Sequence, residues 1–343
     1  MNSKNISALF GGFLILASSA HATDSLGVAG TFNDFIFNQA TASGGGEAEG
    51  AIAVGGIGLG ANQVAFTAGG GYDILSHNDP ATVGALTSVG LYVNGNVDFT
   101  SGGQMGNSGN AYVSGNFVNG GGPYNFNGGG ALYYGGTLSG SIQNNTDHQA
   151  NDVSSSVFAS AQTSMKNLST AIGGLAPTAG LLNNGDPNNW SLNIGSHSSA
   201  TTYVLDLTAS QLSNNVTLGL GDLSSNDTLL INVTGGNVNS FGVSINANGL
   251  QNRILWNYTG SGTFTVNDRQ MEGSLLAPSA TVDQSIVIEG NLIANDWNMT
   301  GGVENHSYDF NGFVPATTPE PSAYATFALG GLGLIIRRRS SKK

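Results

Sequence analysis

A short apolar segment that ends in glycine recurs about every twenty residues in the first half of the chain. The copies that align without gaps are AIAVGG from Ala51, LYVNGN from Leu91, AYVSGN from Ala111 and ALYYGG from Ala131. Their shared glycines are Gly55, Gly95, Gly115 and Gly135. Such segments are typical of a strand that runs into a tight turn with positive φ. Twenty residues accommodate three strands and three corners, so we predict a mainly β fold, a right-handed parallel β-solenoid.

One copy of this repeat is degenerate. The segment GYDILS at residues 71–76 keeps Tyr72 in register with Tyr92 and Tyr112 but lacks the glycine. Equivalent residues of stacked coils lie about 4.8 Å apart, so these three tyrosines are expected to form a column along the solenoid. Two interpretations remain open: the rings point outward and contact a ligand, or they point into the core.

The pattern changes between residues 147 and 172, where apolar residues recur every three or four positions. These residues are Ala150, Val153, Val157, Ala161, Met165, Leu168 and Ile172. Their spacing indicates one face of an amphipathic α-helix, with Asp147 as its N-cap and Gly173-Gly174 at its end. At ~1.5 Å per residue this helix is about as long as eight stacked coils. We therefore predict one long α-helix that flanks the solenoid with its apolar stripe inward.

Beyond residue 200 the apolar segments return at a spacing near ten residues. They include YVLDL from Tyr203, VTLGL from Val216, TLLINV from Thr228, RILWNY from Arg253, TFTV from Thr263 and GSLLAPSATV from Gly273. Asparagine, aspartate and glycine occupy the positions between them, where corners are expected. The same solenoid is predicted to resume there with less regular coils.

The composition restricts the function. The chain has 343 residues, 53 of them glycine, no cysteine, 9% charged residues and a formal net charge of -12. So few cations cannot neutralise phosphates, which excludes nucleic acid as a partner. A chain without cysteine has no disulfide, zinc thiolate site or cysteine nucleophile. Between the two ends the cations are Lys166, Arg253 and Arg269, so the surface favours neutral polar partners or cations.

Both ends of the chain carry targeting features. Residues 1–22 combine a lysine, an apolar run and Ala-His-Ala, which indicates a secretory signal for the Sec machinery, cleaved between Ala22 and Thr23. The apolar run 323–336 near the other end precedes a basic cluster. As a helix it would span about 21 Å, less than the roughly 30 Å hydrocarbon layer, so it is a marginal membrane anchor. The basic cluster is expected to stay on the cytoplasmic side.

Residues 318–343 resemble the PEP-CTERM sorting signal of Gram-negative bacteria that make exopolysaccharide. The resemblance rests on a triplet, a short apolar span and a basic cluster in the required order: Pro319, Glu320 and Pro321, then Arg337, Arg338 and Arg339. It implies that an exosortase processes the tail, residues 316–343, during transient anchoring in the inner membrane. The domain at residues 23–315 would then reach the cell surface or the extracellular matrix. A permanent tail anchor is the alternative.

The segments RILWNY, GSLLAPSATV, IEGNLIA and GGVENHSYDFNGFVP, together with LGVAGTFNDFIFN and EGAIAVGG near the start, carry a second resemblance. They are similar to the choice-of-anchor A family of bacterial adhesin-like proteins, over about residues 25–315. This resemblance implies a non-catalytic adhesin that binds polysaccharide or a matrix surface. The order of solenoid half, long helix and second half also resembles the ice-binding β-helix fold. Ice binding would require regularly repeated Thr-x-Thr, whereas Thr263 and Thr265 form one pair with no expected copies one coil away.

Enzymatic chemistry is the remaining hypothesis, because polysaccharide lyases and hydrolases also use parallel β-helices. Glu304 and His306 lie close together in sequence, but we expect a structural role for them in the last coil. Arg253 is expected to pair with a carboxylate or a carbonyl near its strand, and Arg269 is the other arginine available to such chemistry. The carboxylate pairs are Glu47 with Glu49 and Asp268 with Glu272.

No cofactor is expected. The run Gly56-Ile57-Gly58-Leu59-Gly60 lacks the spacing and the nearby lysine of a phosphate loop, so it is interpreted as a solenoid corner. Calcium remains open without assigned ligands, because corners rich in Asp and Asn offer oxygen donors but no EF-hand-like loop occurs.

Overall fold

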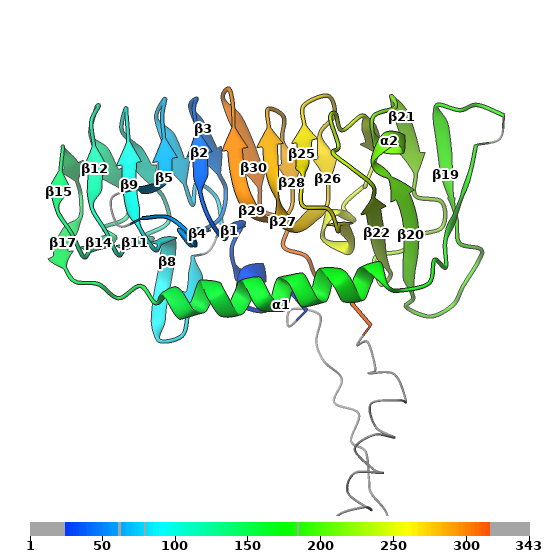
Figure 1. Ribbon diagram of the computed structural model, residues 1–343, viewed down its shortest axis with the longest axis horizontal. Helices are drawn as coiled ribbons and strands as arrows, with labels where there is room; N and C mark the ends of the chain where they lie inside the picture. Colours follow the sequence, from blue (N-terminus) through cyan, green and yellow to red (C-terminus); the bar gives the residue numbers. More distant parts are fainter. Residues whose placement is uncertain (1–24, 61–62, 79, 184, 316–343) are drawn as a thin grey trace, which may run out of the picture.

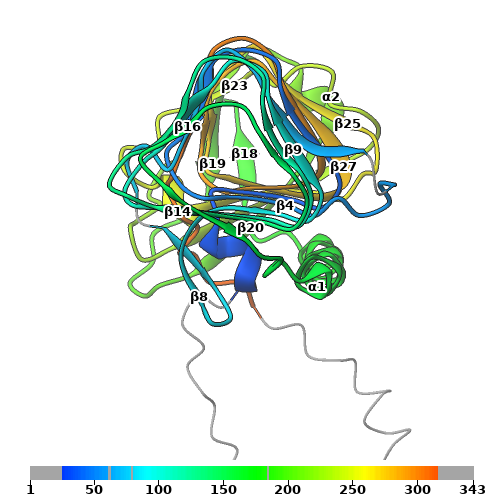
Figure 2. The ribbon, with the colours of Figure 1, turned by 90° about the vertical axis from the view of Figure 1, so that its left-hand side faces the viewer.

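The computed structural model describes residues 25–60, 63–78, 80–183 and 185–315. In this part of the chain, short and mostly parallel strands form coils of roughly triangular outline that stack along one axis (Figure 1, Figure 2). The predicted β-solenoid is confirmed. None of the described helices is both long and apolar enough to cross a bilayer. The predicted signal peptide and sorting tail lie outside the described residues.

The coils present three faces. The first is here called the helix face, because the long helix α1 (Ser155–Gly173) lies along it (Figure 2). Its strands from the first half are β1 (Asp34–Ile36), β4 (Ile52–Val54), β8 (Leu86–Val93), β11 (Asn110–Val113), β14 (Ala131–Tyr134) and β17 (Thr146–Gln149). Those from the second half are β20 (Thr202–Thr208), β22 (Thr228–Thr234), β24 (Ile254–Tyr258) and the beginnings of β27 (Ser274–Gln284) and β29 (Leu292–Met299).

The second face, here called the open face, continues the same sheet around a corner, because β27 and β29 extend through both faces. It contains the ends of these two strands together with β2 (Ala40–Ala42), β5 (Val64–Ala68), β9 (Asn96–Phe99), β12 (Phe117–Asn119), β15 (Leu138–Ser139) and β25 (Thr263–Val266).

The third face, here called the acidic face, is a separate eight-stranded sheet. Its strands are β3 (Gly46–Ala48), β6 (Tyr72–Ile74), β10 (Gly103–Met105), β13 (Tyr124–Phe126), β16 (Ile142–Gln143), β26 (Met271–Glu272), β28 (Ile288–Glu289) and β30 (Val303–His306). A four-stranded sheet at the end of the second half contains β18 (Gly180–Leu182), β19 (Asn189–Asn193), β21 (Val216–Gly219) and β23 (Val243–Ile245). Smaller elements are β7 (Ala81–Val83), α2 (Ala209–Leu212), η2 (Gly27–Thr31) and η3 (Gln251–Arg253).

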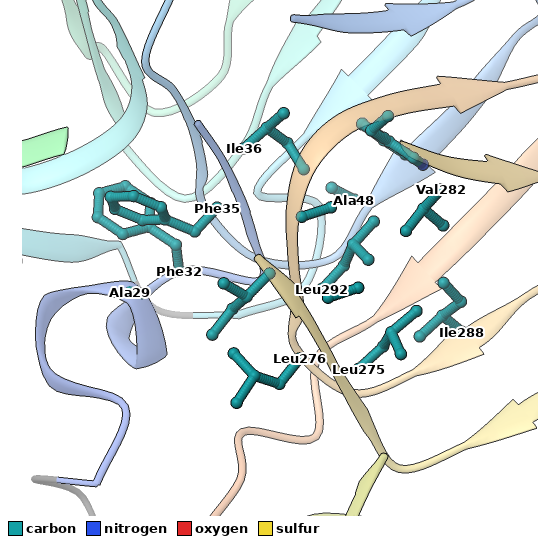
Figure 3. Close-up of a cluster of buried hydrophobic side chains, with 14 of the residues drawn as sticks. Ala29, Phe32, Phe35, Ile36, Ala48, Leu275, Leu276, Val282, Ile288 and Leu292 are labelled. Carbon is teal, nitrogen blue, oxygen red and sulfur yellow. The ribbon is translucent and has the colours of Figure 1, made fainter. Parts of the chain in front are cut away.

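The two ends of the described chain meet in the middle of the solenoid. The first half builds coils from the centre to one end, the segment that ends in α1 carries the chain back past the centre toward the other end, and the second half builds coils back to the centre (Figure 1). There β29 pairs with β1 and β2, and β30 pairs with β3, all in parallel. Figure 3 shows the core at this junction, where Ile36 of the first half lies near Leu292 of the second. A continuous core thus joins segments from opposite ends of the described chain.

The register of the coils departs from the constant period that the sequence predicts. Tyr112 pairs with Tyr92, which is one predicted period earlier in the chain. On its other side Tyr112 pairs with Tyr133, one residue more than a period later. Tyr92 in turn pairs with Ala53, so this coil is much longer than the predicted period. The backbone N–H of Gly115 donates to the carbonyl of Gly95, and that of Gly136 donates to Gly115, so Gly136 rather than Gly135 continues this column. The prediction of one glycine column through residues 55 and 135 is therefore wrong by one position in each case.

The prediction for Tyr72 is wrong as well. Tyr72 lies in β6 on the acidic sheet, where it pairs with Gly46 and Gly103, so it does not share a column with Tyr92 and Tyr112. The sequence predicts that a new coil begins at residue 71. In the structure this segment is instead β6, the third side of the coil that begins with β4, and the antiparallel β7–β8 hairpin lengthens the chain before the next coil. All three tyrosines are buried, with exposed fractions of 5% or less, so they do not form a ligand-contact column.

The long helix lies where the sequence placed it but begins later. The segment around Asp147 forms β17, and Ser154 is the N-cap residue, whereas the end at Gly173-Gly174 is confirmed. The buried side chains are Phe158, Ala161, Met165, Ser169 and Ile172. The helix packs against β22, β24 and β27, which confirms its flanking position. Phe158 fits because Gly55 has no side chain: a Cβ there would lie 2.8 Å from its ring.

Residues 307–315 run back along the second half after β30. The Arg253 guanidinium donates to the carbonyl oxygen of Asn311 at 2.6 Å, and Thr202 donates to that of Phe313. The expectation that Arg253 pairs with a carbonyl is confirmed. Residue 315 and η2 consequently lie on the same side of the solenoid as α1 (Figure 1).

Candidate functional site

The open face is an extended polar surface on a rigid sheet. Along each of its strands, side chains alternate between the core and solvent: Ala40 and Ala42 are buried while Thr41 is partly exposed, and Phe66 and Ala68 are buried while Thr67 is partly exposed. This alternation follows from the two-residue period of a strand. The buried side chains hold each strand in place, so the spacing between outward side chains on neighbouring strands is set by the hydrogen bonds of the sheet.

One outward column crosses eight strands of this face. In spatial order its members are Thr265, Asp283, Asn298, Thr41, Thr67, Asp98, Val118 and Ser139. Neighbouring strands in such a ladder are about 4.8 Å apart. The column crosses the junction, because Asn298 of the second half pairs directly with Thr41 of the first.

A second, shorter column contains Thr263, Thr281 and Asp296. Thr263 therefore has a threonine one coil away, which corrects the expectation that the Thr263 and Thr265 pair lacks a copy. The sequence did not reveal this because the coils differ in length: the stretch from Thr263 to Thr281 is longer than the stretch from Thr281 to Asp296, and both are shorter than the predicted period.

The threonine hydroxyls of the open face are free to bind an external partner. Within the described residues, the side chains of Thr41, Thr67, Thr263, Thr265 and Thr281 make no hydrogen bond to the protein. The carboxylates are more constrained: Asn298 donates to Asp283 at 2.9 Å, and Asp296 accepts from Asn38 and Asn295. The face thus offers a row of available hydroxyls between fixed acidic and amide groups.

The described residues offer few cations to balance these groups. Lys166 lies on α1, Arg253 is bonded to Asn311, and Arg269 donates to the side chain of Asn215. A face of hydroxyls, amides and carboxylates without neighbouring cations repels polyanions.

Residues 25–307 match a family model described as "Putative Ice-binding-like adhesive domain". The chain belongs to this family. The match covers the whole solenoid, including α1 and the junction, so the ice-binding-like adhesive domain is the principal unit of the chain. The expectation of an adhesin-like domain is thereby confirmed at the level of the family.

Solved structures of low sequence identity are similar to this domain. An ice-binding protein from the Antarctic ascomycete Antarctomyces psychrotrophicus is 13% identical, with 82% of this chain and 96% of that chain covered and a TM-score of 0.31. A domain of ice-binding protein 1 from Shewanella frigidimarina is 11% identical over 82% and 96% of the two chains, with a TM-score of 0.35. An ice-binding protein from an Antarctic bacterium of the Flavobacteriaceae is 16% identical over 83% and 81%, with a TM-score of 0.27. No curated protein matches the chain.

His306 of the adhesive domain has a structural environment. Its Nδ1 lies 2.9 Å from Glu289, and its Nε2 lies 3.1 Å from Glu304, so both ring nitrogens are engaged. Burial lowers the pKa of His306, but the hydrogen bond with Glu304 and the charge of Glu289 outweigh it and raise the pKa above its ordinary value. A protonated His306 that links two strands stabilises the last coil, as expected from the sequence.

A second histidine pair resembles a catalytic dyad but is also structural. His197 Nε2 lies 2.8 Å from Asp227, beside a cavity of about 390 Å³ lined by several serines. Burial raises the pKa of Asp227, but hydrogen bonds from Ser224, His197 and Thr201 lower it to about 2. The other ring nitrogen of His197 faces the Gly195 carbonyl rather than a serine hydroxyl. The pair therefore secures the 195–201 loop and does not activate a nucleophile.

The remaining predicted positions have plain structural roles. Gly56 and Gly58 adopt positive φ in the turn after β4, which confirms the corner interpretation. Asp268 is exposed in a turn, and Glu272 pairs with Glu289 rather than with Asp268. The tyrosines of the first half form a stack in which Tyr112 lies on Tyr133 and Tyr133 on His148, with centroids 4.6 and 4.9 Å apart. Residues 319–321 and 337–339 lie outside the described residues.

Proposed function

We propose that the protein is an exported, non-catalytic adhesin whose open face binds neutral polysaccharide or a similarly hydroxylated matrix surface. The observation that supports this proposal most directly is the row of unpartnered threonine hydroxyls on a rigid parallel sheet. Each hydrogen bond adds only about 0.5–1.5 kcal/mol, so useful affinity arises from several aligned contacts. Asp283 and Asn298 add acceptors and donors of the kind that sugar hydroxyls require.

The test removes hydroxyls without changing shape. Thr41→Val, Thr67→Val and Thr281→Val are combined in one variant, because valine keeps the branched side chain that a strand favours. Three lost hydrogen bonds should weaken binding to the polysaccharide identified on a glycan and matrix-protein array by about tenfold or more. Thr217→Val, at an exposed position of β21, is the matched control. Equal binding by the triple variant and the control would remove the open face from consideration.

Ice binding is the second candidate, supported by the family and by the adjacent Thr263, Thr265 and Thr281 on the open face. Asp283 and Asp296 interrupt this threonine group, and charged side chains bind water more strongly than a hydroxyl array does. For this reason we favour polysaccharide. Thermal hysteresis that disappears in the triple variant would establish ice binding instead.

Export and sorting complete the proposal. A signal peptide at residues 1–22 would direct Sec export, and an exosortase would act on the tail that contains Pro319, Glu320 and Pro321. Pro315 lies beside Thr202 and Thr228, at the starts of β20 and β22 on the helix face, which is not the face proposed to bind the polysaccharide. Cell fractionation tests this: Glu320→Ala should accumulate in the inner membrane, whereas Ser322→Ala should reach the exterior.

A further inference from the structure

A row of carboxylates crosses the acidic face at the junction of the two halves. Glu47 of β3 pairs with Asp73 of β6 on one side and with Glu304 of β30 on the other. Like charges directly opposite each other in neighbouring strands destabilise a sheet. No lysine or arginine of the described residues pairs with this row. His306 pairs with Glu304 at one end of the row, which leaves Glu47 without a lysine or arginine partner.

His77 adds an imidazole to this row. Its Nδ1 lies 3.7 Å from Glu47 Oε1 and 3.8 Å from Glu49 Oε1, and ligand atoms from all three residues lie within 4.8 Å of one another. These separations are too long for hydrogen bonds, which measure roughly 2.7–3.2 Å. Two donor atoms on one tetrahedral ion with bonds of ~2.0–2.2 Å lie about 3.4 Å apart. The distances from His77 Nδ1 to the two glutamate oxygens are only slightly longer than this. The three donors surround a space of ionic size.

The neighbouring histidine on the same sheet provides an internal comparison. His306 lies 2.9 Å from Glu289 and 3.1 Å from Glu304, so a protonated imidazole can donate one hydrogen bond to each carboxylate. His77 Nδ1 lies 3.0 Å from the hydroxyl of Ser76, a neutral group, and neither Glu47 nor Glu49 is within hydrogen-bond distance of it. The Glu47 carboxylate makes no hydrogen bond within the described residues, although its side chain is only 21% exposed. The cluster around His306 needs only a proton on the ring to pair both of its carboxylates. The cluster of His77, Glu47 and Glu49 has space for a cation between its members.

The backbone holds the three side chains in place. The loop after β6 is bonded to β3, because the N–H groups of His77 and Asn78 both donate to the carbonyl of Glu49. Leu75, at the start of this loop, is buried with a positive φ of 59°, a costly conformation for leucine that the surrounding structure maintains. The Glu49 carboxylate also accepts from the N–H of Ser307, which belongs to the last segment of the chain.

We propose that Glu47, Glu49 and His77 bind one divalent transition metal ion of the zinc class. One imidazole and two carboxylates suit zinc better than calcium, which prefers an all-oxygen shell of six to eight ligands. Three protein donors leave a fourth position for water or an external oxygen. The ion neutralises the carboxylate row and, through Glu49 and Ser307, fastens the first half of the solenoid to the last. This site is separate from the open face and does not depend on its function.

The test is a titration of the purified, chelator-treated chain with Zn²⁺ and, separately, with Ca²⁺, followed by calorimetry and thermal unfolding. We expect one Zn²⁺ per chain, a higher melting temperature with Zn²⁺, and preference for Zn²⁺ over Ca²⁺. His77→Ala should weaken Zn²⁺ binding by tenfold or more, and Glu47→Gln with Glu49→Gln should do the same. The imidazole is 64% exposed, so loss of the ring should leave the apo fold intact, which circular dichroism verifies.

Co²⁺ provides a spectroscopic readout that a purely structural role would not change. A four-coordinate Co²⁺ site gives visible absorption bands, which should appear in the parent chain and be lost in His77→Ala. His148→Ala, an exposed histidine at the end of the solenoid, is the matched control and should keep them. Unchanged Zn²⁺ affinity in His77→Ala, or Ca²⁺ binding tighter than Zn²⁺ binding, would overturn the proposal.

Discussion

At the scale of single residues, polar groups inside the solenoid are the most informative. Asp34 of β1 is completely buried at the junction, where Asn305 donates to its Oδ1 at 2.7 Å. Its Oδ2 has no partner among the described residues. Burial raises the pKa of Asp34 from 3.8 to about 7, although hydrogen bonds from Asn305 and Asn33 act in the opposite direction. The nearby Tyr72 hydroxyl is also buried and has no hydrogen-bond partner among the described residues, so it does not donate to the carboxylate, and burial favours the protonated carboxyl.

Stability should therefore depend on pH through Asp34. Its folded-state pKa is raised, so its contribution is complete below pH 3.8 and is lost as the pH rises to about 7. Over that range the free energy of unfolding should fall by up to about 1.4 kcal/mol per pH unit. Urea denaturation at several pH values measures this slope. Asp34→Asn should remove most of it, and a variant with the same slope as the parent would show that other groups cause it.

At the scale of elements, a pair of buried asparagines attaches α1 to the solenoid. Asn257 of β24 donates to the carbonyl of Ser169, and Asn232 of β22 donates to that of Ile172. The two side chains are also bonded to each other at 2.9 Å. These contacts supplement the hydrogen bonds that the helix end already makes, since the Ile172 carbonyl also accepts from the N–H of Leu175. The apolar stripe predicted the flanking position, but these polar contacts depend on the register of β22 and β24.

Loss of one asparagine should loosen the helix. Asn257→Ala removes one hydrogen bond to the Ser169 carbonyl and leaves the buried Asn232 amide oxygen without its donor, which should cost about 1–3 kcal/mol of stability. Chemical denaturation measures the loss, and hydrogen exchange of α1 amides should increase first. Asn226→Ala, at an exposed loop position, is the control and should change stability little. Equal effects of the two substitutions would contradict a specific role of the pair.

At the scale of the whole molecule, the junction makes the two halves interdependent. The pairings β1–β29, β2–β29 and β3–β30 join the first coil to the last, and both the acidic row and the main column of the open face cross this line. Without the second half, β1 to β3 would present unpaired edges and exposed apolar side chains, including Phe35 and Ile36.

Two separately produced halves should therefore combine. Residues 25–152 and 153–315 expressed together should co-purify as a 1:1 complex, whereas each alone should aggregate or remain unfolded. Light scattering after size-exclusion chromatography measures the masses. Ile293→Asp in the second half, which places a charge in the junction core, should prevent the complex. Stable, folded monomers of each half would show that the junction is dispensable.

The sequence alone determined the elements of this protein. Alternating apolar residues closed by glycine specified strands and corners, and a three-to-four-residue spacing specified one helix with a glycine end, because both patterns follow from local backbone geometry. Tertiary structure decided which strands are neighbours. Coils vary in length, from the short one between Thr281 and Asp296 to the long one between Ala53 and Tyr92, and the last coil packs on the first. Columns such as Thr265 to Ser139, and the grouping of Glu47 and Glu49 with His77, arise from hydrogen-bonded register between segments far apart in the chain, which spacing along the sequence does not encode.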